Sequence, residues 1–141
     1  MFKYSAENSE QISLHDCCPA SAQYINHRLI FNFPDGIFFE EYGEDWPNTG
    51  NAEVEFEIKS GVFLYSFESE GELTIRKRWS VEQLIEKINR QEWLLEFAYR
   101  YDGFEEILFT CWISPNNSLA CHEGQLFIGT THEIYRWNPP E

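Results

Sequence analysis

Basic residues are scarce in this chain: ten lysines and arginines stand against 24 aspartates and glutamates, which gives a formal charge of −14. Proteins that bind a nucleic acid backbone carry the opposite sign, because lysine and arginine neutralise its phosphates. The composition therefore argues against nucleic acid as a partner, and against an anionic membrane surface for the same reason. A basic protein partner is compatible with the charge, although solubility alone also explains it.

Several other features are missing. No apolar run is long enough for a transmembrane helix. The opening "MFKYSAENSEQ" lacks the apolar segment of a secretory signal, so we expect a cytoplasmic protein. Neither phosphate-binding glycine pattern occurs. The cysteines are too few and too irregularly spaced for a secreted disulfide scaffold, and we expect free, mostly buried thiols at Cys17, Cys18, Cys111 and Cys121.

Aromatic residues, by contrast, are abundant at 17% of the 141 residues, and such side chains favour pleated sheets. Turn residues divide the chain into nine or ten short apolar segments without any long crossover link, which predicts antiparallel pairing. We therefore expect one domain, residues 1–141, of mainly β class, with α+β as the alternative. The predicted architecture is a curved antiparallel sheet or an open barrel-like sandwich, closed on one side by a helix.

The predicted strands follow from the turns between them. Residues 11–17 suggest a first strand, and "SLACHE" with "QLFIGTTHEIYRW" suggests a last meander of two strands. Leu73 and Ile75 are expected to point inward. The predicted turns between strands are Asn26-His27, Pro34-Asp35-Gly36, Ser60-Gly61, Glu70-Gly71 and Asp102-Gly103.

One helix is predicted over residues 80–91. Ser80 precedes an apolar stripe, and Gln83 follows three residues later, as a capping box requires. The stripe has helical spacing and consists of Val81, Leu84, Ile85 and Ile88.

The stretch "FFEEYGEDWPNTGNAEVEFE" is the most distinctive, with seven carboxylates and no basic residue. Its last part alternates: Glu53, Glu55 and Glu57 share one face of a strand whose other face is apolar. The pattern fits a solvated surface first, a partner-binding surface second and a metal cage least, because the ligand spacing of a calcium loop is absent. Mutual repulsion would disfavour burial, so we expect exposed acids.

Two other clusters have competing interpretations. His15, Cys17, Cys18, Cys121 and His122 are zinc-type ligands without the usual C-x2-C spacing, so packed thiols and histidines are favoured over zinc. Residues 76–78 ("RKR") are too short a basic tract to bind nucleic acid, and we expect them to pair with acids across the sheet.

The segment "ISLHDCCPASAQYINHRLIFNFPDGIFF", residues 12–39, resembles the start of small bacterial domains with an "LHDC"-like strand and an aromatic-rich Asp-Gly turn. Several such small acidic proteins resemble immunity proteins of bacterial toxin systems. The resemblance implies a bacterial, non-enzymatic protein and carries no catalytic residues.

Together these features favour an acidic interaction protein, such as an immunity or inhibitor protein, that docks on a basic partner. Trp46 either contributes to binding or caps the core beside Pro47. An enzyme or ligand binder with a cavity near His15, Asp16, Cys111 and His122, and a homodimerising module, remain alternatives. No catalytic residue, metal or cofactor is assigned. The predicted partner-binding residues are Tyr42, Glu44, Asp45, Trp46, Glu53 and Glu55.

Overall fold

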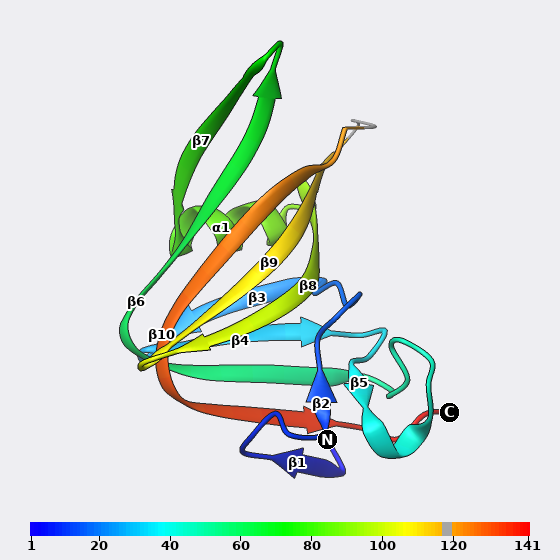
Figure 1. The fold of residues 1–141 in the computed structure, drawn as a ribbon. Coiled ribbons are helices and arrows are strands. Elements are labelled where there is room, and N and C mark those ends of the chain that lie inside the picture. Colours follow the sequence, from blue (N-terminus) through cyan, green and yellow to red (C-terminus); the bar gives the residue numbers. More distant parts are fainter. Residues whose placement is uncertain (117–119) are drawn as a thin grey trace.

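The computed structural model describes residues 1–116 and 120–141 (Figure 1). The fold is mainly β, as the sequence predicts, with ten strands and one α-helix among the described residues. In chain order the elements are β1 (Tyr4–Ala6), β2 (Ile12–Ser13), β3 (Ser21–Ile25), β4 (Arg28–Phe33), β5 (Phe38–Phe39), the 3-10 helix η1 (Glu40–Tyr42), β6 (Ala52–Glu70), β7 (Leu73–Ser80), α1 (Val81–Asn89), β8 (Trp93–Gly103), β9 (Glu106–Pro115) and β10 (His122–Trp137).

All strand pairs are antiparallel, which confirms the predicted sheet type. Eight strands form one sheet with the central order β3-β4-β6-β10-β9-β8, to which β1 is added beside β10 and β7 beside β6. The strands β2 and β5 form a small separate sheet. Among the described strands β3 and β8 do not pair, so the large sheet curves without closing into a barrel.

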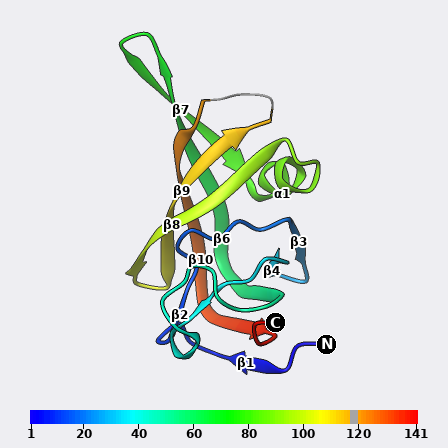
Figure 2. The same cartoon turned by 90° about the vertical axis from the view of Figure 1, so that its right-hand side faces the viewer.

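The long strands β6 and β10 bend near their middles and divide the large sheet into two halves (Figures 1 and 2). The lower half-sheet contains β1, β3, β4, the first half of β6 and the second half of β10. The upper half-sheet contains β7, β8, β9 and the remaining halves. At the bend the register slips: Gly129 is opposite Gly61, but Thr130 is opposite Ile58. The additional β6 residues form a bulge, which bends the strand and increases its twist.

This bulge corrects one predicted turn. Ser60-Gly61 joins no pair of strands, because both residues lie within β6. A Cβ atom at Gly129 would collide with the Ser60 side chain, so glycine is what allows the two bent strands to approach here. In the sequence, a Ser-Gly pair between two alternating segments looks the same whether it reverses the chain or only bends it.

Two hairpin turns are confirmed and one is shifted. Asn26-His27 joins β3 to β4 with positive φ at both residues (53° and 60°), as a type I′ turn requires. Gly71, with φ of 66°, begins the turn from β6 to β7. The turn predicted at Asp102-Gly103 lies at Phe104-Glu105 instead, because Asp102 and Gly103 still belong to β8 and Gly103 pairs with Glu106 of β9.

The Pro34-Asp35-Gly36 turn exists but closes no hairpin. Gly36 N donates to Phe33 O at 3.0 Å, and the chain then enters β5, which pairs with β2 rather than β4. Thr49 lies beside this turn, and its hydroxyl accepts a hydrogen bond from Ile37 N at 2.9 Å. Instead of the expected hairpin, the chain forms a loop in which Thr49 packs against Gly36 and Ile37.

Both ends of the chain also differ from the prediction. Residues 11–17 pair as a strand only over Ile12–Ser13, and β1 was not anticipated. The expected C-terminal meander is one strand, β10; Ser118 and Leu119 of the first predicted segment lie outside the described residues. Gly124 makes no turn there. It accommodates the Ile113 side chain of β9, which would lie 2.8 Å from an added Cβ.

The helix α1 is confirmed together with its cap. Ser80 Oγ accepts from Gln83 N at 3.2 Å, and Gln83 Oε1 accepts from Ser80 N at 2.8 Å. The buried stripe contains Val81, Leu84 and Ile88. At the other end, the Asn89 side chain exchanges two 2.8 Å hydrogen bonds with the Ala22 backbone and so ties α1 to β3. No helix in the described part of the chain is long and apolar enough to cross a membrane.

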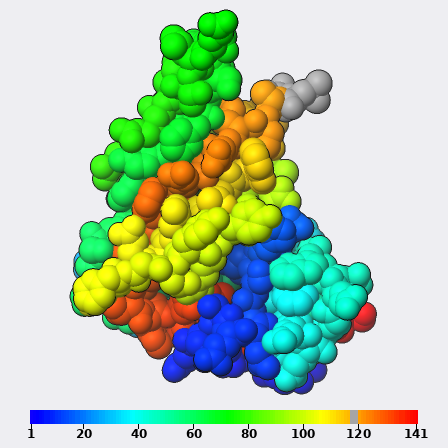
Figure 3. Space-filling model, viewed as in Figure 1, coloured from blue at the N-terminus to red at the C-terminus, as the bar shows by residue number. Residues whose placement is uncertain are grey.

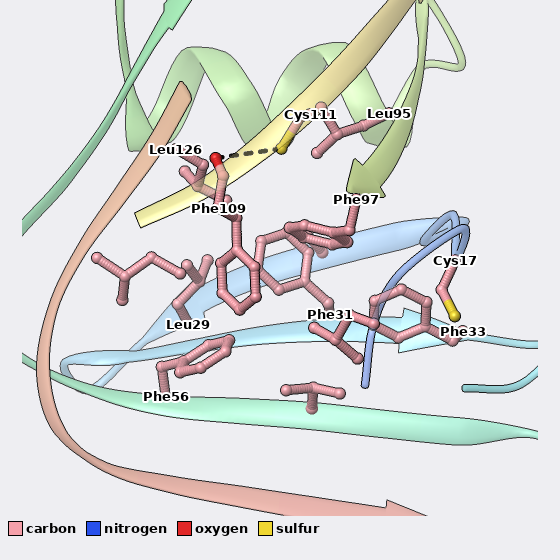
Figure 4. Packing of buried hydrophobic residues seen from close by; sticks show 14 of the residues in the cluster. Cys17, Leu29, Phe31, Phe33, Phe56, Leu95, Phe97, Phe109, Cys111 and Leu126 are labelled. Carbon is pink, nitrogen blue, oxygen red and sulfur yellow. Dashed lines mark hydrogen bonds between the residues drawn. The ribbon is translucent and has the colours of Figure 1, made fainter. Parts of the chain in front are cut away.

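The core fills the angle between the two half-sheets and α1 (Figures 2 and 4). Phenylalanine rings from four strands meet there: Phe97 lies 5.5 Å from Phe31 and 5.0 Å from Phe109 between ring centroids. Leu73, predicted to point inward, is 70% exposed, and Ile75 is half-buried. The reason is that β7 and the end of β6 project beyond the core as a two-stranded arm (Figure 1).

Candidate functional site

The acidic turn, residues 40–45, lies between β5 and β6 at one end of the lower half-sheet (Figure 1). Its backbone is held by Asn48, whose side chain accepts from Phe39 N at 2.8 Å and donates to the carbonyls of Phe39 and Gly43 at 3.0 and 3.2 Å. The four carboxylates are exposed, and within the described residues none of them forms an ion pair. These are Glu40, Glu41, Glu44 and Asp45.

Beside this turn lies the aromatic platform, which we define as Trp46, His15 and Tyr99. Trp46 stacks on Phe38 with centroids 3.7 Å apart and planes 6° from parallel. His15 contacts Trp46 edge-on at 5.6 Å and Tyr99 at 5.1 Å. Its Nδ1 lies 2.8 Å from Ala98 O, and because a carbonyl only accepts, Nδ1 is the donor of this hydrogen bond.

The rings of the platform pack against their neighbours and are open to solvent at the same time. Trp46 is 42% exposed and Tyr99 62% exposed, although ring contacts fix both positions. Trp46 is thus not a core cap, which was the alternative interpretation. Asp16, whose carboxylate is 3.4 Å from His15 Nε2, adds a further acid at the edge.

Tyr42, predicted as a binding residue, is turned inward. Its hydroxyl accepts from Trp137 Nε1 at 3.3 Å, and its ring lies 5.0 Å from Phe39. Tyr42 thus packs against the core and anchors the acidic turn, of which it is a part, to the core. Glu44, Asp45 and Trp46 remain the exposed members of the predicted set in this region.

Glu53 and Glu55 correct the expectation of a wet acidic face on β6. Glu55 is buried, with its side chain 8% exposed between Arg28 of β4 and Arg136 of β10. Glu53 is half-buried and pairs with Arg136 at 2.7 Å. Glu57 alone of the three is exposed. The repulsion argument failed because β4 and β10 flank this part of β6, and each brings an arginine to its face.

The zinc-type residues lie in two separate places. Cys17 and Cys18 follow β2, whereas His122 begins β10 near the arm, where it lies 3.5 Å from Glu68 (Figure 1). In the described part of the chain no three potential metal ligands are grouped, and no cysteine is in a disulfide. Burial, with nearby Cys18 and Asp16, raises the pKa of Cys17 to about 12. Cys17 is thus a protonated, packed thiol.

The residues proposed for a catalytic cavity do not converge. His15 lines a cavity of about 120 Å³ together with Arg100 and Tyr135, but Asp16, Cys111 and His122 do not. Cys111 is buried in the core, where burial raises its pKa, and its thiol donates to Phe109 O at 3.7 Å (Figure 4).

Arg100 beside this cavity is already saturated with protein partners. Its guanidinium donates to Asp102, Glu133 and the Tyr135 hydroxyl at 2.8–3.2 Å. Five N–H groups are all a guanidinium has. These hydrogen bonds link β8 to β10 and use all the N–H groups of Arg100, so that none is left to bind a ligand.

The basic tract on β7 differs from the prediction in part. Lys77 does pair with an acid across the hairpin, Glu68, at 2.9 Å. Arg76 and Arg78 instead lie over the rings of Tyr65 and Phe63, at 4.7 and 4.2 Å from the centroids. They point to the opposite face of the arm, where β6 presents aromatic side chains rather than acids.

Two members of the aromatic platform were not predicted as binding residues: His15 and Tyr99. Tyr99 leaves the strand pattern because the β8–β9 register slips between Phe97 and Arg100. The sequence carries a faint signal for it, since "EFAYRY" breaks strict alternation. His15 belongs to a loop more than eighty residues away, and its position beside β8 depends on backbone pairing between Phe97 and residues 16–17.

Comparison of this chain with known protein families, with characterised proteins and with solved structures found no match. The resemblance of residues 12–39 to small bacterial domains stays a prediction. The functional assignment therefore depends on the surface around the acidic turn and the aromatic platform.

Proposed function

We propose that this protein is a non-enzymatic recognition protein that docks on a basic protein through the acidic turn and the aromatic platform. The observation that carries the proposal is the arrangement of exposed, fixed rings beside carboxylates that have no basic partner among the described residues. An immunity or inhibitor protein that covers an electropositive active site is the role of this kind that fits best.

The two components of the surface would act differently. Uncompensated carboxylates attract a basic protein over a distance and speed its association. Tryptophan and tyrosine supply contact energy at the centre of interfaces, because their large rings lose little freedom on binding. Trp46 and Tyr99 are already held in place by His15 and Phe38, so little further ordering would be needed.

The proposed surface omits part of the predicted set. Glu53 and Glu55 face Arg28 and Arg136, which neutralise them, and Tyr42 faces the core. The proposed contact residues are Glu40, Glu41, Glu44, Asp45, Trp46, His15 and Tyr99.

A titration with a short oligolysine peptide, followed by amide chemical shifts, tests where a polycation binds. We expect the largest shifts in residues 40–46 and around His15 and Tyr99, with weaker binding as salt shortens the range of electrostatic attraction. Glu44→Lys with Asp45→Lys should reduce the affinity strongly.

The matched control reverses two other exposed acids, Glu70→Lys and Glu72→Lys, at the tip of the arm. It changes the net charge equally but leaves the proposed surface intact. If both double variants lost affinity equally, or if the shifts centred elsewhere, the peptide would sense only net charge and the proposal would fail. Inhibition of a basic toxin nuclease by the wild type, but not by the Glu44/Asp45 variant, would support the inhibitor role specifically.

A further inference from the structure

The upper half-sheet has an outer face that no other part of the described chain covers. In Figure 1, α1 lies behind β9 and β10, on the core side, and Figure 3 shows the opposite surface of β6, β7, β8, β9 and β10 directly. Three cross-strand rows make up this outer face. The first row is Ser80, Phe63, Phe127, Leu108 and Tyr101; the second is Arg78, Tyr65, Gln125 and Thr110; the third is Arg76, Phe67, Glu123, Trp112 and Glu96.

Aromatic side chains of the outer face contact one another across the strands. Phe63 and Phe127 stack with centroids 4.9 Å apart, and Tyr65 meets Phe127 edge-on at 5.9 Å. Trp112 is 48% exposed and Tyr101 55% exposed on the neighbouring strands. Phe63, Tyr65 and Phe127 are half-buried, and Arg78 and Arg76 lie over the rings of Phe63 and Tyr65. A contiguous group of aromatic side chains at the surface of a sheet is typical of an interface rather than of a solvated surface.

The charge of the outer face differs from that of the chain. Its three rows carry two arginines, Arg76 and Arg78, and two glutamates, Glu96 and Glu123, so that the charges sum to zero. The whole chain has a charge of −14. Two copies could therefore approach through this face without bringing their acidic turns together.

The strand order also suits a two-fold contact. β10 is central, with β6 and β7 on one side and β9 and β8 on the other. A two-fold axis along β10 would place β7 of one copy over β8 of the second. The third row then becomes self-complementary: Arg76 of one copy lies over Glu96 of the second, and Phe67 lies over Trp112 of the second. In the first row, Phe63 of one copy lies over Leu108 of the second.

We propose that two copies of this chain associate through the outer face, as two packed sheets related by a two-fold axis along β10. Arg76 of each copy pairs with Glu96 of the other, and Trp112 packs on Phe67 of the other. The axis brings the two Glu123 carboxylates near one another at the rim, which opposes association. This inference is independent of the proposed basic partner, because the acidic turn lies outside the outer face.

Sedimentation velocity over a range of protein concentrations tests the proposal. We expect a reversible monomer–dimer equilibrium for the wild type and a monomer for Trp112→Lys. The matched control is Trp46→Lys, an exposed tryptophan of similar accessibility on the aromatic platform. It should leave the dimer intact while weakening oligolysine binding, so that the two proposals fail or succeed separately.

A charge swap tests the orientation. Arg76→Glu or Glu96→Arg alone should raise the dimer dissociation constant by about tenfold or more, and the double variant should restore it. Glu123→Gln should lower the constant. A wild type that stays monomeric up to its solubility limit, or a double variant that is no better than the single ones, would overturn the proposal.

Discussion

Residues 40–45 and residues 53–57 belong to one acidic stretch, yet their carboxylates meet opposite surroundings. Glu53 and Glu55 lie on β6 between β4 and β10, and both neighbouring strands place an arginine beside them. The acids of the turn lie in η1 and the loop after it, and none of them pairs with a strand in the described part of the chain. The surroundings of a carboxylate in this stretch therefore depend on which strands flank it, and hardly at all on the local composition.

The largest expected effect of this difference is on stability. Glu55→Lys would place a third positive charge between Arg28 and Arg136 at a buried position, in place of the carboxylate that compensates both. Breaking a buried ionic group in this way typically costs about 3–5 kcal/mol. We expect the free energy of unfolding, measured by denaturant titration, to fall by about that amount.

The matched control for this substitution is Glu57→Lys, on the same face of the same strand. Glu57 is exposed and has no ion pair in the described part of the chain. It should change the free energy of unfolding by no more than about 0.5 kcal/mol. Equal effects at residues 55 and 57 would show that the two arginines do not distinguish them.

A smaller effect, with the opposite sign, is expected at the acidic turn. Neutralising its four acids, as Glu40→Gln, Glu41→Gln, Glu44→Gln and Asp45→Asn, removes repulsion without removing any ion pair among the described residues. The free energy of unfolding should stay the same or rise, by no more than about 0.5 kcal/mol per site. Added salt should stabilise the wild type more than this variant. A clear loss of stability would mean that these acids have partners in solution.

The smallest expected effect is on the pKa of the Cys18 thiol. Burial, together with the negative charges of Glu96, Asp16 and Asp35, raises its pKa from 9.0 to about 11. Glu96→Gln should therefore lower the pKa of Cys18 slightly. Iodoacetamide labelling of Cys18, followed by mass spectrometry between pH 9 and 11, measures this shift, with Glu70→Gln as a control far from the thiol.

The same thiol predicts how stability depends on pH. Because the folded pKa is raised, the folded chain keeps the thiol proton that the unfolded chain loses above about pH 9. The contribution of Cys18 to stability is thus complete below pH 9 and is lost as the pH rises through 11. Cys18→Ala should flatten this alkaline decline, and an unchanged slope would contradict the assignment.

The local sequence was sufficient for the features that depend on short-range chemistry. The capping box of α1 follows from Ser80 and Gln83, and the turn at Asn26-His27 follows from residues that accept positive φ. Alternation on β6 placed Val54 and Phe56 correctly in the core. Antiparallel pairing followed from the absence of long crossovers.

Which strands lie side by side depends on contacts between distant parts of the chain, and the surroundings of the acids follow from that pairing. Arg28 and Arg136 are 27 and 81 residues away from Glu55, yet pairing with β6 brings both to it. His15 likewise contacts Tyr99 only because the loop after β2 pairs with β8. The number of carboxylates in residues 38–57, and the alternation of Glu53, Glu55 and Glu57 along one strand face, can be recognised in the sequence itself. Which of them are neutralised was decided by strand pairing, because charges interact across distances that the local sequence does not encode.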